Sequence, residues 1–313
     1  MNDNPGTTPS DRPVVSNLGY MFAVISSFGT AIAIVLGKWN LEAISPLLMN
    51  CLIFSVATVF LMVTYLPVRG IRRIFTLTRQ GWFWLAMFTI TSWLAIWAFW
   101  AGVQAMDPSL AAFLNRAEVL VLLVLGFIFL KERFTRLEIS GVLLSITGIV
   151  IMRLTLRMEY SYGFWMVLLS ALLFGLTEFL SKIALRHVGP TNLTFIRNMF
   201  MAAVYWIVLR ATGEGLDGLD RVWPGVVALG LVGPILGRLM YLQALKRMAL
   251  SRVAIISQSQ PVFVILIALL ALHQLPTFRE IVGGIFLTVG CVTMIVARNF
   301  KRGRGKAPVG QNP

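Results

Sequence analysis

The amino-acid sequence predicts an all-α membrane protein with ten transmembrane helices arranged as two inverted five-helix repeats. Three observations carry this prediction: an apolar composition, apolar runs long enough to cross a bilayer, and similarity between the two halves of the chain. The 313 residues are 58% hydrophobic and only 13% charged, with a mean hydropathy of +0.80. A soluble globule of this length could not bury so much apolar surface. The composition therefore argues against a soluble enzyme, a disordered regulator or a disulfide scaffold.

Ten apolar runs, most of them about 20 residues long, lie between two polar ends, and a helix of that length spans ~30 Å of hydrocarbon. We expect the spans at residues 18–37, 46–66, 82–103, 109–130, 137–152, 163–185, 191–209, 222–242, 251–272 and 281–296. Residues 1–17 lack the basic start and cleavage site of a signal peptide, so we expect a disordered cytoplasmic tail there. Residues 299–313 are expected to form a second, basic cytoplasmic tail.

The basic residues concentrate in alternate loops. With a cytoplasmic N-terminus, 18 of the 27 Lys and Arg residues lie on the cytoplasmic side, six lie on the other side and three lie within spans. This asymmetry follows the positive-inside rule, so we expect a multi-pass protein of the bacterial inner membrane with both termini in the cytoplasm. The formal charge of +14 is then an orientation signal and a surface for anionic lipids, and it does not indicate a nucleic-acid partner.

The two halves, residues 18–153 and 154–298, repeat each other. Matching residues at an offset of 144 are Gly19 and Gly163, Ser26 and Ser170, Lys38 and Lys182, and Pro46 and Pro190. Matching residues at an offset of 142 are Ser109 and Ser251, Ala112 and Ala254, Glu138 and Glu280, Gly141 and Gly283, and Gly148 and Gly290. Because five is an odd number of spans, the second copy enters the membrane upside down. Inverted repeats are typical of secondary transporters, which bind substrate between the halves.

Small residues line one face of the fifth and tenth predicted helices. They are Gly141, Ser145 and Gly148 in the first repeat, and Gly283 and Gly290 in the second. Small faces permit close helix packing. We interpret them as structural, with a homodimer contact as the alternative.

The sequence contains no pattern that indicates a cofactor or a metal. Cys51 and Cys291 lie inside apolar runs, where inert buried thiols are the simplest interpretation. No cluster of His, Cys and carboxylate residues has metal-ligand spacing, and no nucleotide-binding loop or nucleophile motif occurs. We therefore expect neither a cofactor nor enzymatic activity.

Residues 104–118, with the sequence Gln-Ala-Met-Asp-Pro-Ser-Leu-Ala-Ala-Phe-Leu-Asn-Arg-Ala-Glu, resemble the fourth helix of the EamA-type drug/metabolite transporters, as does the continuation through residues 130–133. Residues 251–261 resemble the second copy of this motif. The resemblance extends over nearly all of residues 19–297. It implies ten helices, cytoplasmic termini, and export or exchange of small metabolites or drugs. It also implies a cavity lined by the first four helices of each repeat, with the fifth and tenth helices outside.

The chain departs from the pattern of that family at several positions. The usual arginine early in the second helix is present in the second repeat as Arg197, but Ile53 takes the matching position in the first. Val119 stands where proline often follows the glutamate. Glu178 occupies a position that is usually apolar or aromatic.

Ionisable groups at bilayer depth are costly unless they face a cavity or a partner, so each is a functional candidate. Glu118 shares a helix face with Asn115 in the predicted fourth helix, and Ser257 and Gln260 are their equivalents in the second repeat. We expect these four side chains to form a polar cavity lining shared by both halves. The alternative is a set of hydrogen bonds between helices.

Three arginines lie within spans. Arg116 points away from Glu118 on an ideal helix, and it either binds an anionic substrate or pairs with a carboxylate on another helix. Arg197 and Arg238 have no acidic residue near them in the sequence. Residues 233–237 before Arg238 are expected to bend or loosen the helix. We therefore regard Arg238 as the best anion-binding candidate, with Tyr241 one turn away.

Glu178 and Lys182 are spaced i, i+4 in the order that favours an ion pair. Lys182 can also extend to the membrane surface, and Lys38 is its equivalent in the first repeat. The alternative for Glu178 is a site that binds and releases a proton. Glu118 and Glu178 are therefore the candidates for proton coupling.

Trp93, Trp97 and Trp100 follow one helix face at i, i+4 and i+7. They predict either an aromatic cavity wall, suited to planar or cationic substrates, or packing and interface anchors. We include Trp93 and Trp97 among the candidate substrate-binding residues.

Together these patterns predict a secondary transporter that exports or exchanges a small metabolite or drug-like molecule by alternating access. Because no ATP-binding motif occurs, an ion gradient, counter-exchange or the substrate gradient must supply the energy. The alternative is a lipid flippase or scramblase whose arginines hold a phosphate headgroup. A membrane enzyme and a channel are weaker interpretations, since no carboxylate pair lies at a membrane face and no ring of carbonyls or charges occurs.

Overall fold

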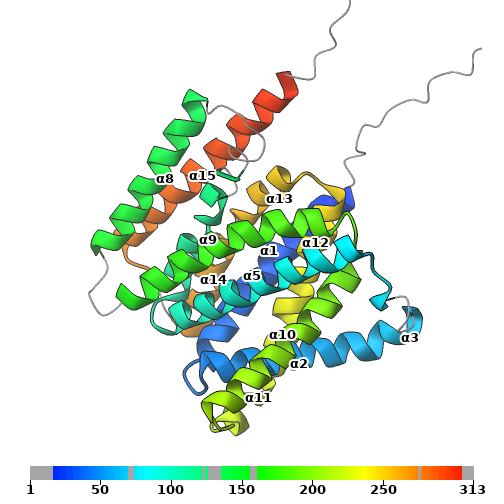
Figure 1. Cartoon of the computed structure of the whole chain (residues 1–313). Coiled ribbons are helices and arrows are strands. Elements are labelled where there is room, and N and C mark those ends of the chain that lie inside the picture. The colour runs from blue at the N-terminus through cyan, green and yellow to red at the C-terminus, as the bar shows by residue number, and fades with distance from the viewer. Residues whose placement is uncertain are drawn as a thin grey trace, which may run out of the picture.

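The computed structural model describes residues 17–69, 74–121, 124–125, 135–155, 161–273 and 276–304. Within these ranges the only regular secondary structure is helical (Figure 1). Nine helical segments in the described part of the chain are long and apolar enough to cross a membrane, which confirms an all-helical, multi-pass membrane protein. The expected fourth span, 109–130, includes residues outside the described ranges, so the number of ten spans stays a prediction.

Polar caps begin several helices of the first half. These helices are α1 (Asn17–Asn40), α2 (Pro46–Thr64), α3 (Leu66–Arg69), α5 (Arg79–Gln104), α6 (Pro108–Asn115) and α8 (Arg136–Thr155). The side chains of Ser45, Thr78 and Asp107 accept hydrogen bonds from backbone N–H groups in the first turns of α2, α5 and α6. Such caps satisfy N–H groups that have no partner inside the helix.

The second half includes a span that contains a π-helical segment. Its elements are α9 (Ser161–Ala184), α10 (Pro190–Thr212), α11 (Leu219–Leu231), η2 (Val232–Gly237), α12 (Arg238–Arg247), α13 (Leu250–Ser257), α14 (Gln260–Leu272) and α15 (Phe278–Arg304). The elements α11, η2 and α12 follow one another within a single span. The irregularity expected at residues 233–237 is the π-helical segment η2, which contains Pro234. Proline removes a backbone hydrogen bond and clashes with the preceding turn.

The fourth helix of each repeat contains a two-residue break, although residues 252–272 still form one candidate span. In the first repeat α6 ends at Asn115, and helix resumes at Glu118. In the second repeat α13 ends at Ser257, and α14 begins at Gln260. Pro261 accounts for the second break because it has no N–H group to donate to the carbonyl of Ser257.

Each break is stabilised by a side chain from the other repeat. The Nη1 atom of Arg116 donates a hydrogen bond to the free carbonyl of Ser257 at 3.1 Å. The Sγ atom of Cys291 donates to the carbonyl of Arg116 at 3.4 Å. The breaks therefore place backbone polar groups inside the bundle without leaving these two carbonyls unpaired.

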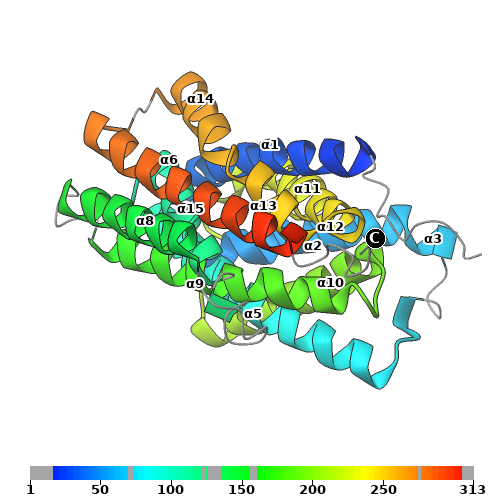
Figure 2. The ribbon, with the colours of Figure 1, turned by 90° about the horizontal axis from the view of Figure 1, so that it is seen from above.

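Helices from the two halves pack against each other in pairs. The pairs are α5 with α9, α2 with α10, α1 with η2 and α12, and α8 with α15. Figures 1 and 2 show α8 and α15 side by side along one flank of the bundle. The largest apolar cluster includes Met152 of α8 and Leu287 and Met294 of α15, so this pair packs against the rest of the bundle along one flank (Figure 1).

The small faces of α8 and α15 are packed directly against each other. A methyl group added at Gly141 would lie 2.6 Å from Met294 Cγ and 2.8 Å from the Gly290 carbonyl oxygen. Ser145 Oγ also donates to the carbonyl of Leu287 at 3.3 Å. The structural interpretation of these glycines is confirmed. Because their faces are occupied within the chain, a homodimer through them is not available, and dimer formation stays a prediction.

Lys38 fastens the end of α1 to the end of α5. Its Nζ atom donates hydrogen bonds to the carbonyls of Val103 at 3.0 Å, Gln104 at 2.9 Å and Met106 at 3.0 Å. The last carbonyls of a helix have no partner inside the helix and form the negative end of its dipole. A half-buried ammonium group is therefore well placed there.

Lys182 makes the equivalent contact in the second repeat. Its Nζ atom donates to the carbonyls of Leu245 and Met248, the latter at 3.0 Å. The ion pair expected between Glu178 and Lys182 is not formed, because Lys182 lies one turn nearer the helix end and reaches the carbonyls that end α12. This contact fastens α9 to α12 as Lys38 fastens α1 to α5.

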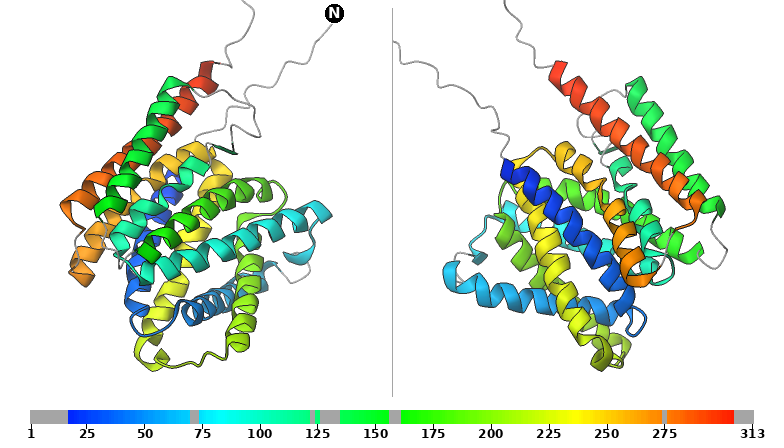
Figure 3. Two further views of the ribbon diagram at one scale, coloured as in Figure 1. Left: turned by 60° about the vertical axis from the view of Figure 1, so that its left-hand side comes forward. Right: turned by 180° about the vertical axis from the view of Figure 1, so that it is seen from behind.

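α1 begins and α15 ends at the same end of the bundle (Figure 3). The last helix continues to Arg304, beyond residue 296, where the tenth span was expected to end. The first part of the segment expected to be a C-terminal tail is therefore helical. The remainder of that segment and residues 1–16 lie outside the described residues.

Candidate functional site

A cavity of about 160 Å³ lies inside the bundle and is lined by both repeats. Its polar lining residues are Ser26, Ser27, Thr30, Asn115, Arg116, Glu118, Glu178, Arg197, Arg238, Tyr241, Ser257 and Gln260. These residues come from the first four helices of each repeat, and the cavity lining includes no residue of α8 or α15. Five charged residues that the sequence places deep within spans therefore meet at one cavity, although they are up to 122 positions apart in the chain: Arg116, Glu118, Glu178, Arg197 and Arg238.

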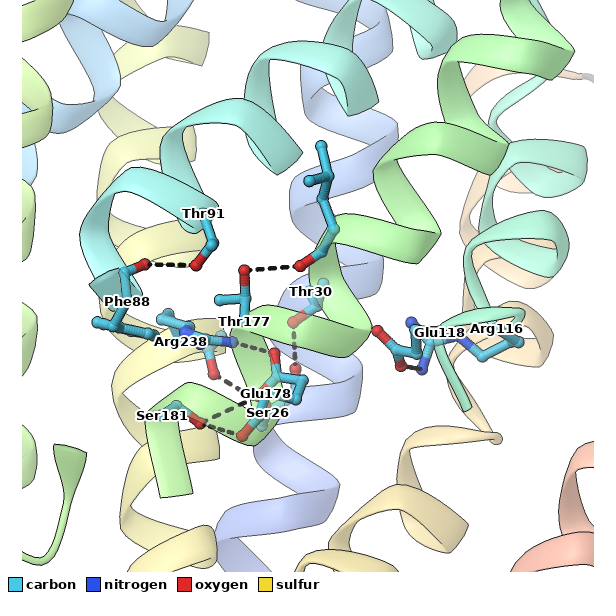
Figure 4. Close-up of polar contacts among 12 residues, drawn as sticks. Ser26, Thr30, Phe88, Thr91, Arg116, Glu118, Thr177, Glu178, Ser181 and Arg238 are labelled. Carbon is cyan, nitrogen blue, oxygen red and sulfur yellow. Dashed lines mark hydrogen bonds and ion pairs between the residues drawn. The ribbon is translucent and has the colours of Figure 1, made fainter. Parts of the chain in front are cut away.

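Arg238 of α12 forms an ion pair with Glu178 of α9 (Figure 4). Ser181 supports this pair, because its Oγ atom donates to the Glu178 carbonyl at 2.8 Å and lies 3.4 Å from Glu178 Oε2. Both charged side chains are largely buried. Arg238 is therefore neutralised by a residue 60 positions away, a pairing that no local spacing in the sequence indicates.

Arg116 and Glu118 form the second ion pair, with 3.1 Å between Nη1 and Oε1. On an unbroken helix these residues would point in different directions. The break after Asn115 turns the chain so that both line the cavity. The expectation that Arg116 points away from Glu118 is thus wrong, because it assumed a continuous helix.

Arg197 of α10 is 2% exposed and has no carboxylate within ion-pair distance among the described residues. Its Nη1 atom donates to Asn198 Oδ1 at 3.1 Å. Its guanidinium lies over the rings of Phe54, 5.5 Å from the centroid, and Phe88, at 5.6 Å. Cation–π contacts of this kind attract a guanidinium but supply no net negative charge.

Arg238 also lies over the ring of Phe88. Its guanidinium lies 5.2 Å from the centroid of Phe88 and 5.2 Å from that of Tyr241. Phe54, Arg197, Phe88, Arg238 and Tyr241 therefore alternate as rings and guanidinium groups, and we call these five residues the arginine–aromatic stack. Because the ring of Phe88 is shared, the two cations are held close together while only one of them has an acidic partner.

The polar residues of the broken helices also line the cavity. Asn115 and Glu118 of the first repeat face it together with Ser257 and Gln260 of the second. The side chains of Asn115 and Gln260 are at most 7% exposed. The four residues singled out by repeat matching therefore lie at one site.

Two of the three tryptophans lie elsewhere. Trp97 is 42% exposed on the surface of α5, and the ring of Trp93 packs against Tyr205 with 6.2 Å between centroids. Neither is among the lining residues, whereas Trp100 is. The helix face that carries the three tryptophans is wider than the part of it that borders the cavity. Their spacing alone therefore does not show which of them lines the cavity.

Sequence reasoning missed the small polar residues of α1. Ser26 Oγ donates to the carbonyl of Gly237 at 2.8 Å, and Thr30 Oγ1 donates to the Ser26 carbonyl at 2.8 Å. The carbonyl of Gly237 at the end of η2 is thus occupied by Ser26. The spacing of Ser26 and Thr30 at i, i+4 was the available signal, although short hydroxyl side chains are common in membrane helices.

No group of three or more His, Cys, Asp and Glu side chains in the described ranges could hold a metal ion. Cys51 and Cys291 are both buried and free. The chemistry of the cavity is therefore that of guanidinium, carboxylate, amide and hydroxyl groups beside aromatic rings.

The model of the EamA-like transporter family matches residues 17–154 and 161–296 of this chain. An uncharacterized transporter of Synechocystis sp. is 23% identical over 244 residues, which are 74% of this chain and 70% of that protein. An uncharacterized transporter of Archaeoglobus fulgidus is 23% identical over 268 residues, which are 83% of this chain and 92% of that protein.

A solved crystal structure has the same fold, with a TM-score of 0.65 at 17% sequence identity. The match covers 93% of this chain and 100% of the other. At this identity the likeness concerns the fold alone.

Proposed function

The chain belongs to the EamA-like transporter family and is a multi-pass membrane transporter, and on this premise we propose that it exports or exchanges a small metabolite or drug-like molecule by alternating access. The single observation that carries the proposal is the central cavity, which residues of both repeats line. Its two ion pairs and its uncompensated arginine are the kind of buried charge that marks a transport path.

Inverted repeats can open a central site to either side of the membrane in turn, and the lysine contacts support such an arrangement here. Lys182 binds the carbonyl of Met248, whose side chain packs beside Gly19 at the start of α1. Lys38 is 19 residues further along α1, or about 28 Å at 1.5 Å per residue. The equivalent contacts of the two repeats thus lie near opposite ends of the bundle, as expected for an inverted pair.

We further propose the bacterial inner membrane as the location, with both termini in the cytoplasm. The excess of basic residues in alternate loops supports this orientation. The start of α1 and the end of α15 also lie at one end of the bundle (Figure 3).

Cysteine accessibility tests the mechanism. Thr30→Cys places a thiol at the cavity, in a background where Cys51 and Cys291 are replaced by serine. We expect a membrane-impermeant thiol reagent to label this variant from either side of the proteoliposome membrane. Reversing the substrate gradient should change the side from which labelling is faster. Glu214→Cys in the exposed loop before α11 is the control, and it should be labelled from one side only. Labelling of the Thr30→Cys variant from a single side under every gradient would refute alternating access.

Proton coupling, for which Glu118 and Glu178 are the candidates, is tested by substrate flux under an imposed pH gradient. We expect Glu118→Gln to make the flux independent of the gradient while substrate binding persists. Flux that ignores the pH gradient in both wild type and variant would refute coupling through these groups, leaving exchange or the substrate gradient as the energy source.

The cavity volume of about 160 Å³ favours a small molecule over a two-chain lipid. The alternative function, that of a lipid flippase or scramblase, can be tested in the same system. Movement of labelled phospholipid in the same proteoliposomes, lost in Arg238→Ala, would support it.

A further inference from the structure

The charges that line the cavity do not balance. The lining contains three arginines and two glutamates. The ion pairs of Arg116 with Glu118 and of Arg238 with Glu178 use both carboxylates. Arg197 is left with one uncompensated positive charge at 2% exposure. A buried charge without a counter-charge is costly, so a site that keeps one is built for a negative group that comes from elsewhere.

The neighbours of Arg197 hold it in place but do not neutralise it. The rings of Phe54 and Phe88 lie beside its guanidinium, and Asn198 Oδ1 accepts a hydrogen bond from its Nη1 atom. Glu178 acts on Arg197 only at longer range, because its carboxylate is paired with Arg238. The arginine–aromatic stack therefore fixes the direction of the guanidinium while leaving its charge available.

Hydrogen-bonding capacity at the cavity is unbalanced in the same sense. Five buried side-chain nitrogens of lining residues have no acceptor within the described protein: Arg116 Nε, Arg197 Nε, Arg238 Nε, Arg238 Nη2 and Gln260 Nε2. The corresponding unpaired acceptors number only one, Asn115 Oδ1. Buried donors are almost always paired in proteins. The cavity thus suits a ligand that brings acceptors rather than donors.

The remaining walls are apolar. They include Phe54, Phe99, Trp100 and Phe174, together with Ile34 and Ile53. A ligand that fits about 160 Å³ and contacts these walls has a compact aromatic or branched body.

We propose that the substrate is a small organic monocarboxylate whose acidic group binds Arg197 and whose apolar body lies against the aromatic walls; this inference rests on the transport function proposed above. One carboxylate balances the single uncompensated charge, and the planar guanidinium matches it with two parallel hydrogen bonds. A phosphate monoester carries about −1.5 to −2 and would over-balance the site. An amino acid or a cation brings an ammonium group, for which both glutamates are already engaged.

The test compares matched probes on the purified full-length protein in detergent. Benzoate, hydrocinnamate and isovalerate are each compared with their neutral amides, and benzylammonium and phenylalanine are added, all at constant ionic strength. Binding is read from the rise in the thermal unfolding midpoint with ligand concentration. We expect at least one carboxylate to bind about tenfold or more tightly than its amide, as a hydrogen bond to a charged group implies.

Arg197 variants locate the binding site. We expect Arg197→Gln to reduce the affinity for the carboxylate to that for its amide. Arg197→Lys should restore only part of the difference, because a lysine lacks the planar fork. Arg153→Gln is the matched control, since Arg153 also lies over a ring, 5.7 Å from the centroid of Phe164, but does not line the cavity. If Arg197→Gln does not fold, the comparison of carboxylate and amide on wild type still decides.

Two results would overturn the inference: amides, benzylammonium or phenylalanine that bind as tightly as the carboxylates, or a protein that no carboxylate stabilises. These failures differ from failure of the proposed function. If the Thr30→Cys variant is labelled alternately from the two sides but the protein prefers a cation, the carboxylate proposal is refuted and the transport proposal is not. If a carboxylate binds at Arg197 but labelling occurs from one side only, alternating access is refuted and the carboxylate proposal is not.

Discussion

The two repeats agree in the contacts that hold the bundle together and differ where they face the cavity. Both have a lysine that binds the carbonyl ends of a neighbouring helix, Lys38 and Lys182. Both begin their last helix with a reciprocal cap: the N–H of Thr135 donates to Glu138 Oε2 at 2.7 Å, and that of Thr277 donates to Glu280 Oε2 at 2.7 Å. We call these lysine, cap and glycine contacts the frame.

The positions at the cavity have no such agreement. Glu178 and Arg197 stand where the first repeat has Ile34 and Ile53, at the same offset of 144, and all four residues line the cavity. Conversely, the first repeat has Glu118 where the second has Gln260, at an offset of 142. Under the proposed alternating access, the frame must open in the same way to either side of the membrane, whereas a substrate molecule has no symmetry of its own. The frame is therefore shared by the two repeats, whereas the site is divided between them.

The largest effect is expected from breaking the ion pair at the site. Glu178→Ala leaves Arg238 beside Arg197 without a counter-charge, and loss of one partner of a buried pair costs about 3–5 kcal/mol. The free energy of unfolding, measured by titration with sodium dodecyl sulfate, should fall by that amount. The double variant Glu178→Leu with Arg238→Met should recover most of the loss. Equal losses in the single and the double variant would mean that charge is not the cause.

The lysine contacts are expected to rank second and to be equal in the two repeats. Lys38→Met and Lys182→Met each remove charge-assisted hydrogen bonds to helix-end carbonyls, at a cost of about 2–3 kcal/mol. The same titration measures both, and Lys246→Met, at an exposed position of α12, is the control. A marked difference between Lys38→Met and Lys182→Met would show that the frame is less symmetric than its contacts.

The glycine contacts give a third, smaller test of the same symmetry. A methyl group at Gly283 would lie 2.6 Å from Met152 Cγ and 2.9 Å from the Gly148 carbonyl oxygen, nearly the distances found at Gly141. Overpacking, offset in part by the better helix propensity of alanine, should cost about 1–2 kcal/mol in both Gly141→Ala and Gly283→Ala. Gly233→Ala, where a methyl group would meet no atom closer than 3.5 Å, should not lose stability. Loss in only one of the two variants would contradict an equivalent frame.

The smallest effect concerns a cap that only one repeat has. Asp107 accepts hydrogen bonds from the N–H groups of Ser109 at 2.7 Å and Leu110 at 3.4 Å, whereas Ala249 at the equivalent position has no side-chain cap. Asp107→Ala should cost about 1 kcal/mol in unfolding free energy. Asp107→Asn should retain the cap, and an equal loss in both variants would contradict this role.

Asp107 should also make the stability of the protein depend on pH. It lies between α5 and α6, outside the candidate spans, and burial raises its pKa above the usual value of 3.8, with a smaller contribution from the negative charge of Glu280. The native carboxyl therefore holds its proton more tightly than the unfolded one. The stability of wild type relative to Asp107→Asn should therefore fall as pH rises from the pKa of the unfolded carboxyl to that of the native carboxyl. It should stay level at higher pH. A constant difference from pH 3 to pH 7 would contradict the raised pKa.

Much of the fold could be predicted because its signals are local. Apolar runs of helix length are read along the chain, and the repeat follows from matches such as Lys38 with Lys182. The breaks at Asn115 and Ser257 were missed because Pro261 also suits the first turn of a helix, and Arg116 gives no sign of a break. The cavity residues could be predicted as a set because a charge within hydrocarbon must face a cavity or a partner.

The positions of most spans, the repeat, and the group of buried charges that includes Arg116, Glu118, Glu178, Arg197 and Arg238 thus follow from the sequence alone. Which of these charges neutralise each other depends on the tertiary structure. Hydrophobicity and helical period act over a few residues, whereas an ion pair depends on the distance between side chains of different helices. Because α9 packs against α12, Glu178 forms its ion pair with Arg238, and Arg197 has no carboxylate partner among the described residues. This pairing sets the net charge of the cavity.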